Sequence, residues 1–238
     1  MSNTFQRYEI KFLVNAEQRA LLEKAFQGKM KPDPHGDSTV CSIYYDTPDF
    51  RLIRHSLEKP VYKEKLRLRS YGMAAPTDAV YLELKKKYKG VVYKRRISLP
   101  ERLASSYLLG SVGMPDRSQI CREIDYFKNF YGELVPAMYL CYDRCAFFSQ
   151  DDPNLRATFD RNIRWRREAM SLTCPPGGTA LLSPDLSLFE VKTASSIPLW
   201  LTAALDRGGI RKSSFSKYGE AYRTLLSSGK ERLVNCCA

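Results

Sequence analysis

Alternation of apolar and polar residues recurs in many short segments of the chain and predicts the strands of an antiparallel sheet. The expected strands are residues 7–14, 39–45, 62–71, 79–88, 91–99, 137–148, 155–165 and 188–193. A turn with the sequence Tyr88-Lys89-Gly90-Val91 is expected to join the fourth and fifth strands into a hairpin.

Helical segments are expected between these strands, because capping residues and longer apolar periods occur there. The expected helices are residues 15–26, 48–56, 100–109, 118–131, 199–207 and 217–226. Asn15 and Thr47 are the expected N-caps of the first two, with Pro48 at the first helical position. Gly208 ends the fifth helix. Residues 31–37 and 173–178 are expected to be loops.

One face of the predicted strands is repeatedly charged, since side chains at alternate positions of a strand share a face. Its charged residues are Arg7, Glu9, Lys11, Lys65, Arg67, Arg69, Glu83, Lys85, Lys87, Lys94, Arg96, Arg144, Arg156, Asp160, Glu190 and Lys192. A solvated polar face explains any single strand. The same charged face, however, recurs from strand to strand, and the apolar residues on the other face are large enough to need helices that cover them. If helices cover the apolar face, the charged face must point inward. We therefore expect an α+β fold, a closed antiparallel β-barrel with helices packed on the outside.

The charge of the chain points to an anionic ligand for this interior. There are 38 Lys and Arg residues against 26 Asp and Glu residues, a net charge of +12. Cations crowded in one lumen repel one another unless a polyanion compensates them, and phosphate chains offer many acceptor oxygens to Arg and Lys. The carboxylates Glu9, Glu83, Asp160 and Glu190 are hard ligands suited to Mg²⁺ or Mn²⁺. No nucleic acid partner is expected, because these carboxylates would repel its backbone.

Other features narrow the class of protein. We expect a single domain over residues 1–230 and a disordered tail over residues 231–238. The 7 cysteines are irregularly spaced, which favours reduced thiols, and neither a signal peptide nor a membrane-length apolar run is evident, so a cytoplasmic location is expected. His35 and His55 do not suggest a metal site or triad, and no P-loop motif is present. The segment Tyr44-Tyr45-Asp46 is interpreted as an edge strand leading into a capped helix rather than as a phosphate contact.

The charged segments also carry a resemblance to a known family, which covers most of the chain. They are Arg7-Tyr8-Glu9-Ile10-Lys11-Phe12, Ser42-Ile43-Tyr44-Tyr45-Asp46-Thr47, Lys65-Leu66-Arg67-Leu68-Arg69, Leu82-Glu83-Leu84-Lys85, Tyr93-Lys94-Arg95-Arg96, Tyr142-Asp143-Arg144, Phe189-Glu190-Val191-Lys192 and Ser214-Phe215-Ser216-Lys217-Tyr218. In this order they resemble the vacuolar transporter chaperone (VTC) domain of the triphosphate tunnel metalloenzymes, also called the CYTH-like superfamily. In this chain Ser214 stands where the family often has a second Lys before Lys217.

The resemblance implies roles for individual residues. The residues that would hold nucleotide and product phosphates in catalysis are Lys11, Arg67, Arg69, Lys85, Arg144, Arg156, Lys192 and Lys217. Glu190 would hold the metal. The other inward cations expected to contact phosphates are Arg7, Lys65, Lys87, Lys94 and Arg96.

The resemblance also implies an activity, since catalytic members of the family transfer the γ-phosphate of ATP onto a growing polyphosphate. The expected protein is thus an ATP-dependent polyphosphate polymerase that uses Mn²⁺ or Mg²⁺, with ATP and inorganic polyphosphate as partners. A separate membrane partner is compatible with this activity but is not visible in the sequence. A tunnel hydrolase of triphosphates or polyphosphate, and a non-catalytic polyphosphate or nucleic-acid binder, remain the alternatives.

Overall fold

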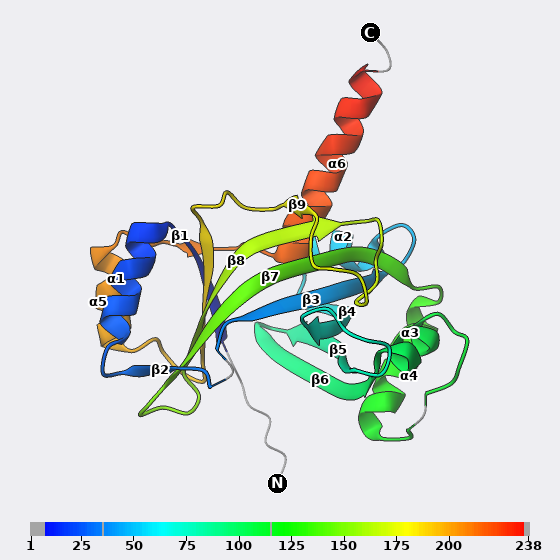
Figure 1. Cartoon of the computed structure of the whole chain (residues 1–238), viewed down its shortest axis with the longest axis horizontal. Helices are drawn as coiled ribbons and strands as arrows, with labels where there is room; N and C mark the ends of the chain where they lie inside the picture. The colour runs from blue at the N-terminus through cyan, green and yellow to red at the C-terminus, as the bar shows by residue number, and fades with distance from the viewer. Residues whose placement is uncertain (1–7, 35, 115, 236–238) are drawn as a thin grey trace.

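The computed structural model describes residues 8–34, 36–114 and 116–235, in which every strand belongs to one antiparallel sheet (Figure 1). The strands are β1 (Tyr8–Val14), β2 (Met30–Pro32), β3 (Ser38–Asp46), β4 (Tyr62–Tyr71), β5 (Ala79–Tyr88), β6 (Val91–Pro100), β7 (Val135–Ser149), β8 (Arg156–Arg166), β9 (Thr179–Ala180), β10 (Ser187–Thr193) and β11 (Lys212–Ser213). Their order is β11-β1-β10-β8-β7-β3-β4-β5-β6, with β2 paired to β7 and β9 to β8.

The strands predicted from alternation are confirmed. Each expected strand is found within a few residues of its predicted bounds, and β5 and β6 form the expected hairpin. The short strands β2, β9 and β11 were not predicted. β2 overlaps the first two residues of the loop expected over residues 31–37, because it pairs with the distant β7. The interpretation of Tyr44-Tyr45-Asp46 as an edge strand is wrong, since β3 is hydrogen-bonded to β4 on one side and to β7 on the other.

The helices are α1 (Ala16–Phe26), α2 (Arg51–Leu57), α3 (Glu101–Leu108), α4 (Gln119–Tyr131), α5 (Leu199–Arg207) and α6 (Lys217–Asn235). Asn15 caps α1 as expected, in a capping box with Gln18. The predicted start of α2 is wrong by three residues. Its N-cap is Phe50, in the left-handed conformation with φ 59°, and the carboxylate of Asp46 accepts the N–H groups of Leu52 and Ile53.

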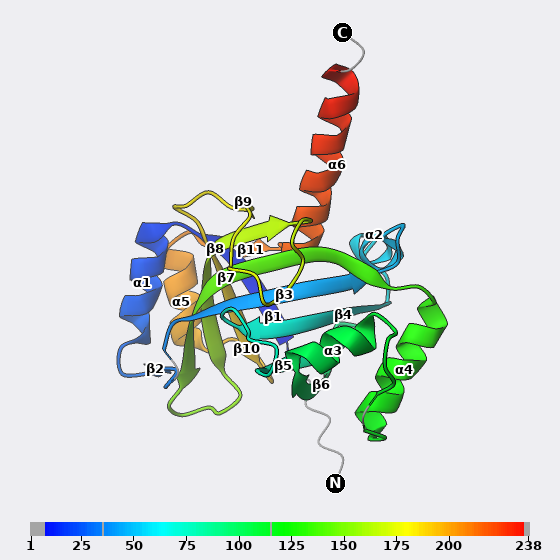
Figure 2. The same cartoon turned by 45° about the vertical axis from the view of Figure 1, so that its right-hand side comes forward.

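Two hydrophobic clusters lie on the face of the sheet opposite the charged residues, which we call the outer face. One lies under α1 and α5 and includes Phe12, Phe159 and Phe189. The other lies under α3 and α4 and includes Leu66 and Leu82. The two helix pairs occupy opposite ends of the molecule in both views (Figures 1 and 2). The apolar residues of the alternating strands therefore form the core, as their spacing predicts.

Helix α6 departs from the expected arrangement, because its first turns contact the charged side of the sheet, which we call the inner face. Tyr218 stacks on Tyr44 of β3, with ring centroids 4.7 Å apart, and its hydroxyl donates to the buried carboxylate of Asp46 at 2.8 Å. The rest of the helix projects away from the sheet (Figures 1 and 2). The prediction that all helices lie outside is therefore wrong for the start of α6.

Removing the Tyr218 hydroxyl tests this attachment. Tyr218→Phe keeps the stacked ring but deletes a hydrogen bond to a buried carboxylate, so we expect the free energy of unfolding to fall by about 1.5–3 kcal/mol. Urea denaturation measures it. Tyr222→Phe, which changes a nearby buried ring of the same helix, is the control. An unchanged urea midpoint for Tyr218→Phe would show that this bond does not hold α6 to the sheet.

The sheet curls toward its inner face. Glu9 of β1 and Lys85 of β5 lie near opposite ends of the strand order, yet their side chains meet at 2.7 Å. No backbone pairing joins the end strands β6 and β11 within the described parts of the chain. The closed barrel expected from the sequence is thus seen as a strongly curled sheet that side chains bridge.

The C-terminal tail expected over residues 231–238 falls partly on α6, which continues to Asn235. Residues 236–238 lie outside the described residues. Among the helices that the structure describes, none has both the length and the apolar character required to cross a membrane.

Candidate functional site

The inner face gathers charged side chains from seven strands and the first turn of α6. Its described charged residues include Glu9, Lys11, Lys63, Lys65, Arg67, Arg69, Glu83, Lys85, Lys87, Lys94, Arg96, Arg144, Arg156, Asp160, Glu190, Lys192 and Lys217. Antiparallel register sets many of them directly opposite one another, as Lys11 is to Glu190 and Arg67 to Glu83. Cations clearly outnumber carboxylates on this face.

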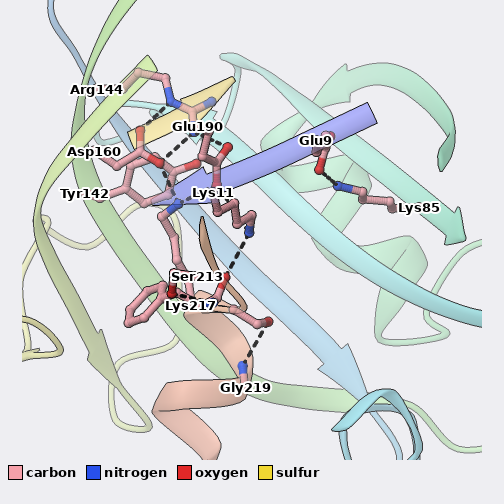
Figure 3. Close-up of polar contacts among 12 residues, drawn as sticks. Glu9, Lys11, Lys85, Tyr142, Arg144, Asp160, Glu190, Ser213, Lys217 and Gly219 are labelled. Carbon is pink, nitrogen blue, oxygen red and sulfur yellow. Dashed lines mark hydrogen bonds and ion pairs between the residues drawn. The ribbon is translucent and has the colours of Figure 1, made fainter. Parts of the chain in front are cut away.

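The centre of one half of the inner face is a cluster around two carboxylates (Figure 3). Arg144 binds Asp160 in bidentate fashion at 2.6 and 2.8 Å, and Lys217 contacts the same carboxylate at 2.5 Å. Glu190 lies beside Asp160 and receives longer contacts, from Lys11 at 3.3 Å, Lys217 at 3.4 Å and Arg144 at 3.6 Å. Asp160 is therefore tightly enclosed by cations, whereas the oxygens of Glu190 are held more loosely.

Electrostatics keep this cluster ionised. Burial by itself would raise the pKa of Glu190, but the charges of Lys217, Lys11 and Arg144 outweigh it and hold the pKa well below its usual value. Burial likewise opposes ionisation of Asp160, yet Lys217 and Arg144 lower its pKa. Both groups are therefore carboxylates across the physiological pH range and can act as anionic ligands.

The second half of the inner face is centred on Glu83, whose side chain is fully buried. It contacts Lys94 at 2.5 Å, Arg67 at 2.7 Å and Arg69 at 3.8 Å. Burial alone would raise the pKa of Glu83, but these three cations lower it. One carboxylate thus serves three cations, which leaves this half strongly positive.

Two inner-face lysines, Lys65 and Lys192, form no ion pair with a carboxylate within the described residues. Burial lowers the pKa of Lys65 and of Lys192 to about 8 in each case, and neighbouring cations add to the effect. Burial also lowers the pKa of Lys94 to about 8, although Glu83 opposes it. Such groups gain most from an anion that restores their full charge. The face is accordingly suited to a ligand with several negative charges.

The carboxylates predicted as metal ligands do not form one site. Glu83 lies in its own cation cluster, and Glu9 is paired with Lys85, where its pKa falls to about 2 because cations such as Lys85 overcome the effect of burial. Within the described residues no three His, Cys, Asp or Glu side chains converge to hold a metal. Glu190 and Asp160 fit Mg²⁺ or Mn²⁺ in the manner of sites that combine one or two carboxylates with phosphate oxygens. Glu190, with the longer ion pairs, is the more available of the two.

A few predicted site residues do not join these clusters. Arg7 lies outside the described residues. Arg156 is exposed at the start of β8, opposite Lys192 in register. Arg96 is exposed and lies over the Tyr81 ring, with 3.4 Å to its centroid, and Lys87 lies opposite Lys63. The side chains of Arg156, Arg96 and Lys87 can attract an anion to the inner face but do not belong to its centre.

The structure also adds residues that sequence analysis did not assign to the site. Tyr142 accepts a hydrogen bond from Arg69 at 3.3 Å, and the ammonium of Lys217 lies 4.5 Å from the centre of its ring. Tyr44 accepts from Arg67 at 3.1 Å. Tyr142 shares the inner face of β7 with Arg144, and Tyr44 shares the inner face of β3 with Ser42, so side-chain alternation extended to polar aromatic residues predicts both.

The chain is similar in sequence to known proteins. A family model described as VTC domain matches residues 6–226. Vacuolar transporter chaperone complex subunit 4 of Trypanosoma cruzi (strain CL Brener) is 25% identical over 155 residues, which cover 53% of this chain and 19% of that protein. The matched region thus spans about a fifth of the length of this curated relative.

Two solved structures have the same fold. A proposed adenylyl cyclase of Hippeastrum, described as having a dominant triphosphatase activity, matches with a TM-score of 0.52 and 17% identity, over 94% of this chain and 96% of that one. A proposed adenylate cyclase of Bacillus halodurans matches with a TM-score of 0.52 and 14% identity, over 89% and 95% of the two chains. At these identities the likeness concerns the fold alone.

Proposed function

Because the chain belongs to the VTC domain family, we propose that it is a polyphosphate polymerase that transfers the γ-phosphate of ATP onto inorganic polyphosphate. The reaction would take place in a tunnel formed by the curled sheet. The observation that carries the proposal is the convergence of Lys11, Arg144 and Lys217 on the Asp160 and Glu190 carboxylates within a face rich in uncompensated cations.

The arrangement of charges supports phosphoryl transfer rather than binding alone. Arg67, Arg69 and Lys94 share one carboxylate and would bind the phosphates at one end of a bound chain. Lys11 and Arg144 would bind phosphates at the other end, beside Glu190. Two phosphate groups held in line by fixed cations need little else from the protein, since positioning and charge neutralisation supply most of the rate.

No side-chain nucleophile or general base is required. The attacking group is a terminal phosphate oxygen that is already anionic, so no proton has to be removed from it. The new bond joins this oxygen to the γ-phosphorus of ATP, while the bond from that phosphorus to the β,γ-bridging oxygen breaks and ADP leaves. The cations of the inner face would stabilise the charge that develops on the transferred group and on ADP.

A divalent metal would be held by Glu190, with Asp160 beside it, and phosphate oxygens would complete its coordination. When bound, Mg²⁺ or Mn²⁺ would supply Lewis-acid neutralisation of phosphate charge. Lys11, which contacts Glu190, would then be free to move toward phosphate, while Lys217 would keep its contact with Asp160.

A direct assay distinguishes this proposal from its rivals. Purified protein incubated with ATP and Mn²⁺ should produce ADP and long chains on a gel stained for polyphosphate. Release of inorganic phosphate without chains would instead assign a tunnel hydrolase, an activity of the kind described for the Hippeastrum protein. Unchanged ATP would assign a non-catalytic binder and would contradict the polymerase.

The proposal includes the setting in which the enzyme works. We place its active unit in residues 1–230, as a single domain, and in the cytoplasm, where ATP is supplied. Because a related protein is named as a subunit of a vacuolar transporter chaperone complex, we also propose that a separate membrane partner receives the product. Purification of the protein from membranes should then recover a membrane protein together with bound polyphosphate, and its absence would contradict the proposed partner.

A further inference from the structure

Tyr44 occupies an unusual position for a phenol. It lies on β3, opposite Arg67 of β4 in register, and only 8% of its surface is exposed. Its hydroxyl accepts a hydrogen bond from Arg67 Nη1 at 3.1 Å, and its ring is stacked on Tyr218. The hydroxyl oxygen is therefore fixed on the inner face, where bound phosphates are proposed to lie.

The charges around Tyr44 are unbalanced. Lys65, Arg67 and Arg69 stand on the neighbouring strand, and Glu83, the carboxylate that pairs with Arg67 and Arg69, is also bound by Lys94. Lys65 contacts Ser216 Oγ at 3.3 Å and has no carboxylate partner within the described residues. Arg67, Arg69 and Lys94 thus share one carboxylate, an arrangement that favours an additional negative charge.

We infer that Tyr44 exchanges a proton when a polyanion binds: a phenolate balances the cations of β4 in the free protein, and a phenol donates a hydrogen bond to a phosphate oxygen in the complex. The proton comes from solvent and goes to the Tyr44 oxygen, and no other bond changes. The inference rests on the proposed phosphate ligand, and it names Tyr44 as a residue that positions that ligand.

The groups that face Tyr44 support this exchange. They are Lys65, Arg67 and Arg69 of β4, Glu83 of β5 behind Arg67, Tyr142 of β7 and Tyr218 of α6. Burial alone would raise the pKa of Tyr44, but Arg67, Arg69 and Lys65 outweigh burial and lower it to about 7. A bound polyphosphate would cancel those cations and return the pKa toward its ordinary value, so that binding takes up a proton.

The near-ultraviolet absorbance of tyrosinate, which lies at longer wavelength than that of tyrosine, measures this directly. One pH unit above a pKa of about 7, about nine-tenths of one tyrosine per chain should be ionised in the free protein. Adding tripolyphosphate at pH 8 should remove that absorbance. Tyr44→Phe should lack this absorbance at pH 8, and its binding of tripolyphosphate should no longer take up the proton, nearly one per chain, that binding to wild type takes up.

A control and the contrary outcomes complete the experiment. Tyr45→Phe alters the next residue, whose ring lies in the outer-face core. Burial raises the pKa of Tyr45, so the tyrosinate absorbance should persist in this variant. Absence of tyrosinate at pH 8, or a signal that survives in Tyr44→Phe, would overturn the inference. The tyrosinate signal of the free protein and the binding of tripolyphosphate are measured independently. A tyrosinate signal without any tripolyphosphate binding would therefore contradict the proposed function rather than the ionisation of Tyr44.

Discussion

Replacing Glu190 with Gln should reduce polyphosphate formation from ATP by at least about a hundredfold while the protein still binds tripolyphosphate. The amide keeps the size of the side chain but removes the anionic oxygen proposed to hold the metal. Lys11 and Lys217 lose part of their counter-charge at the same time, so affinity for a metal-free polyanion should be retained or increased. The gel assay measures the first effect and calorimetric titration with tripolyphosphate the second.

A matched variant separates this effect from general loss of charge. Glu123 lies on α4, away from the inner face, and contacts Lys86 and Arg95. Glu123→Gln should therefore leave synthesis unchanged. If Glu190→Gln retained full activity, the metal role of Glu190 would have to be abandoned, whereas loss of both activity and tripolyphosphate binding would indicate a damaged site.

Replacing Asp160 with Asn should destabilise the fold by about 3–5 kcal/mol at pH 7. Asp160 is fully buried and is the counter-charge for Arg144 and Lys217, which would otherwise share Glu190 alone. Urea denaturation measures the change. Tripolyphosphate should recover part of the lost stability, because its oxygens can replace the missing carboxylate.

The pH dependence of this effect has a definite sign. The pKa of Asp160 is lower in the folded protein than in the unfolded chain, so its contribution is fully present above the ordinary Asp pKa of about 4 and is lost as the pH falls below it. The difference between wild type and Asp160→Asn should therefore narrow in acid. Asp143→Asn, on the same sheet but without an ion pair to Arg144 or Lys217, serves as control. Equal stability of wild type and Asp160→Asn at pH 7 would contradict the role of the buried pair.

Much of the secondary structure and the charged face of the sheet could be predicted from the sequence. Alternation in β1, β4, β5 and β10 identified strands and assigned their charged and apolar faces, because side-chain direction in a strand follows from backbone geometry alone. Those faces in turn indicated an anionic ligand, and the ordered motifs indicated the family.

The start of α2 and the closure of the sheet could not be predicted from the sequence. The start of α2 depends on Asp46, whose carboxylate reaches the N–H groups of Leu52 and Ile53 only because of the intervening turn at Phe50. Whether the sheet closes depends on its total curvature. This curvature is the sum of the small rotations between many neighbouring strands, so no local pattern in the sequence predicts it.

By itself the sequence determined the strands, the inward face and its excess of cations. Only the tertiary structure decided how the carboxylates are divided, since strand register places Glu83 opposite Arg67 and Glu190 opposite Lys11. It also decided that Lys217, distant in sequence, bridges Asp160 and Glu190, and that Tyr44 faces Arg67. These contacts depend on long-range pairing, which side-chain periodicity within a single strand cannot encode.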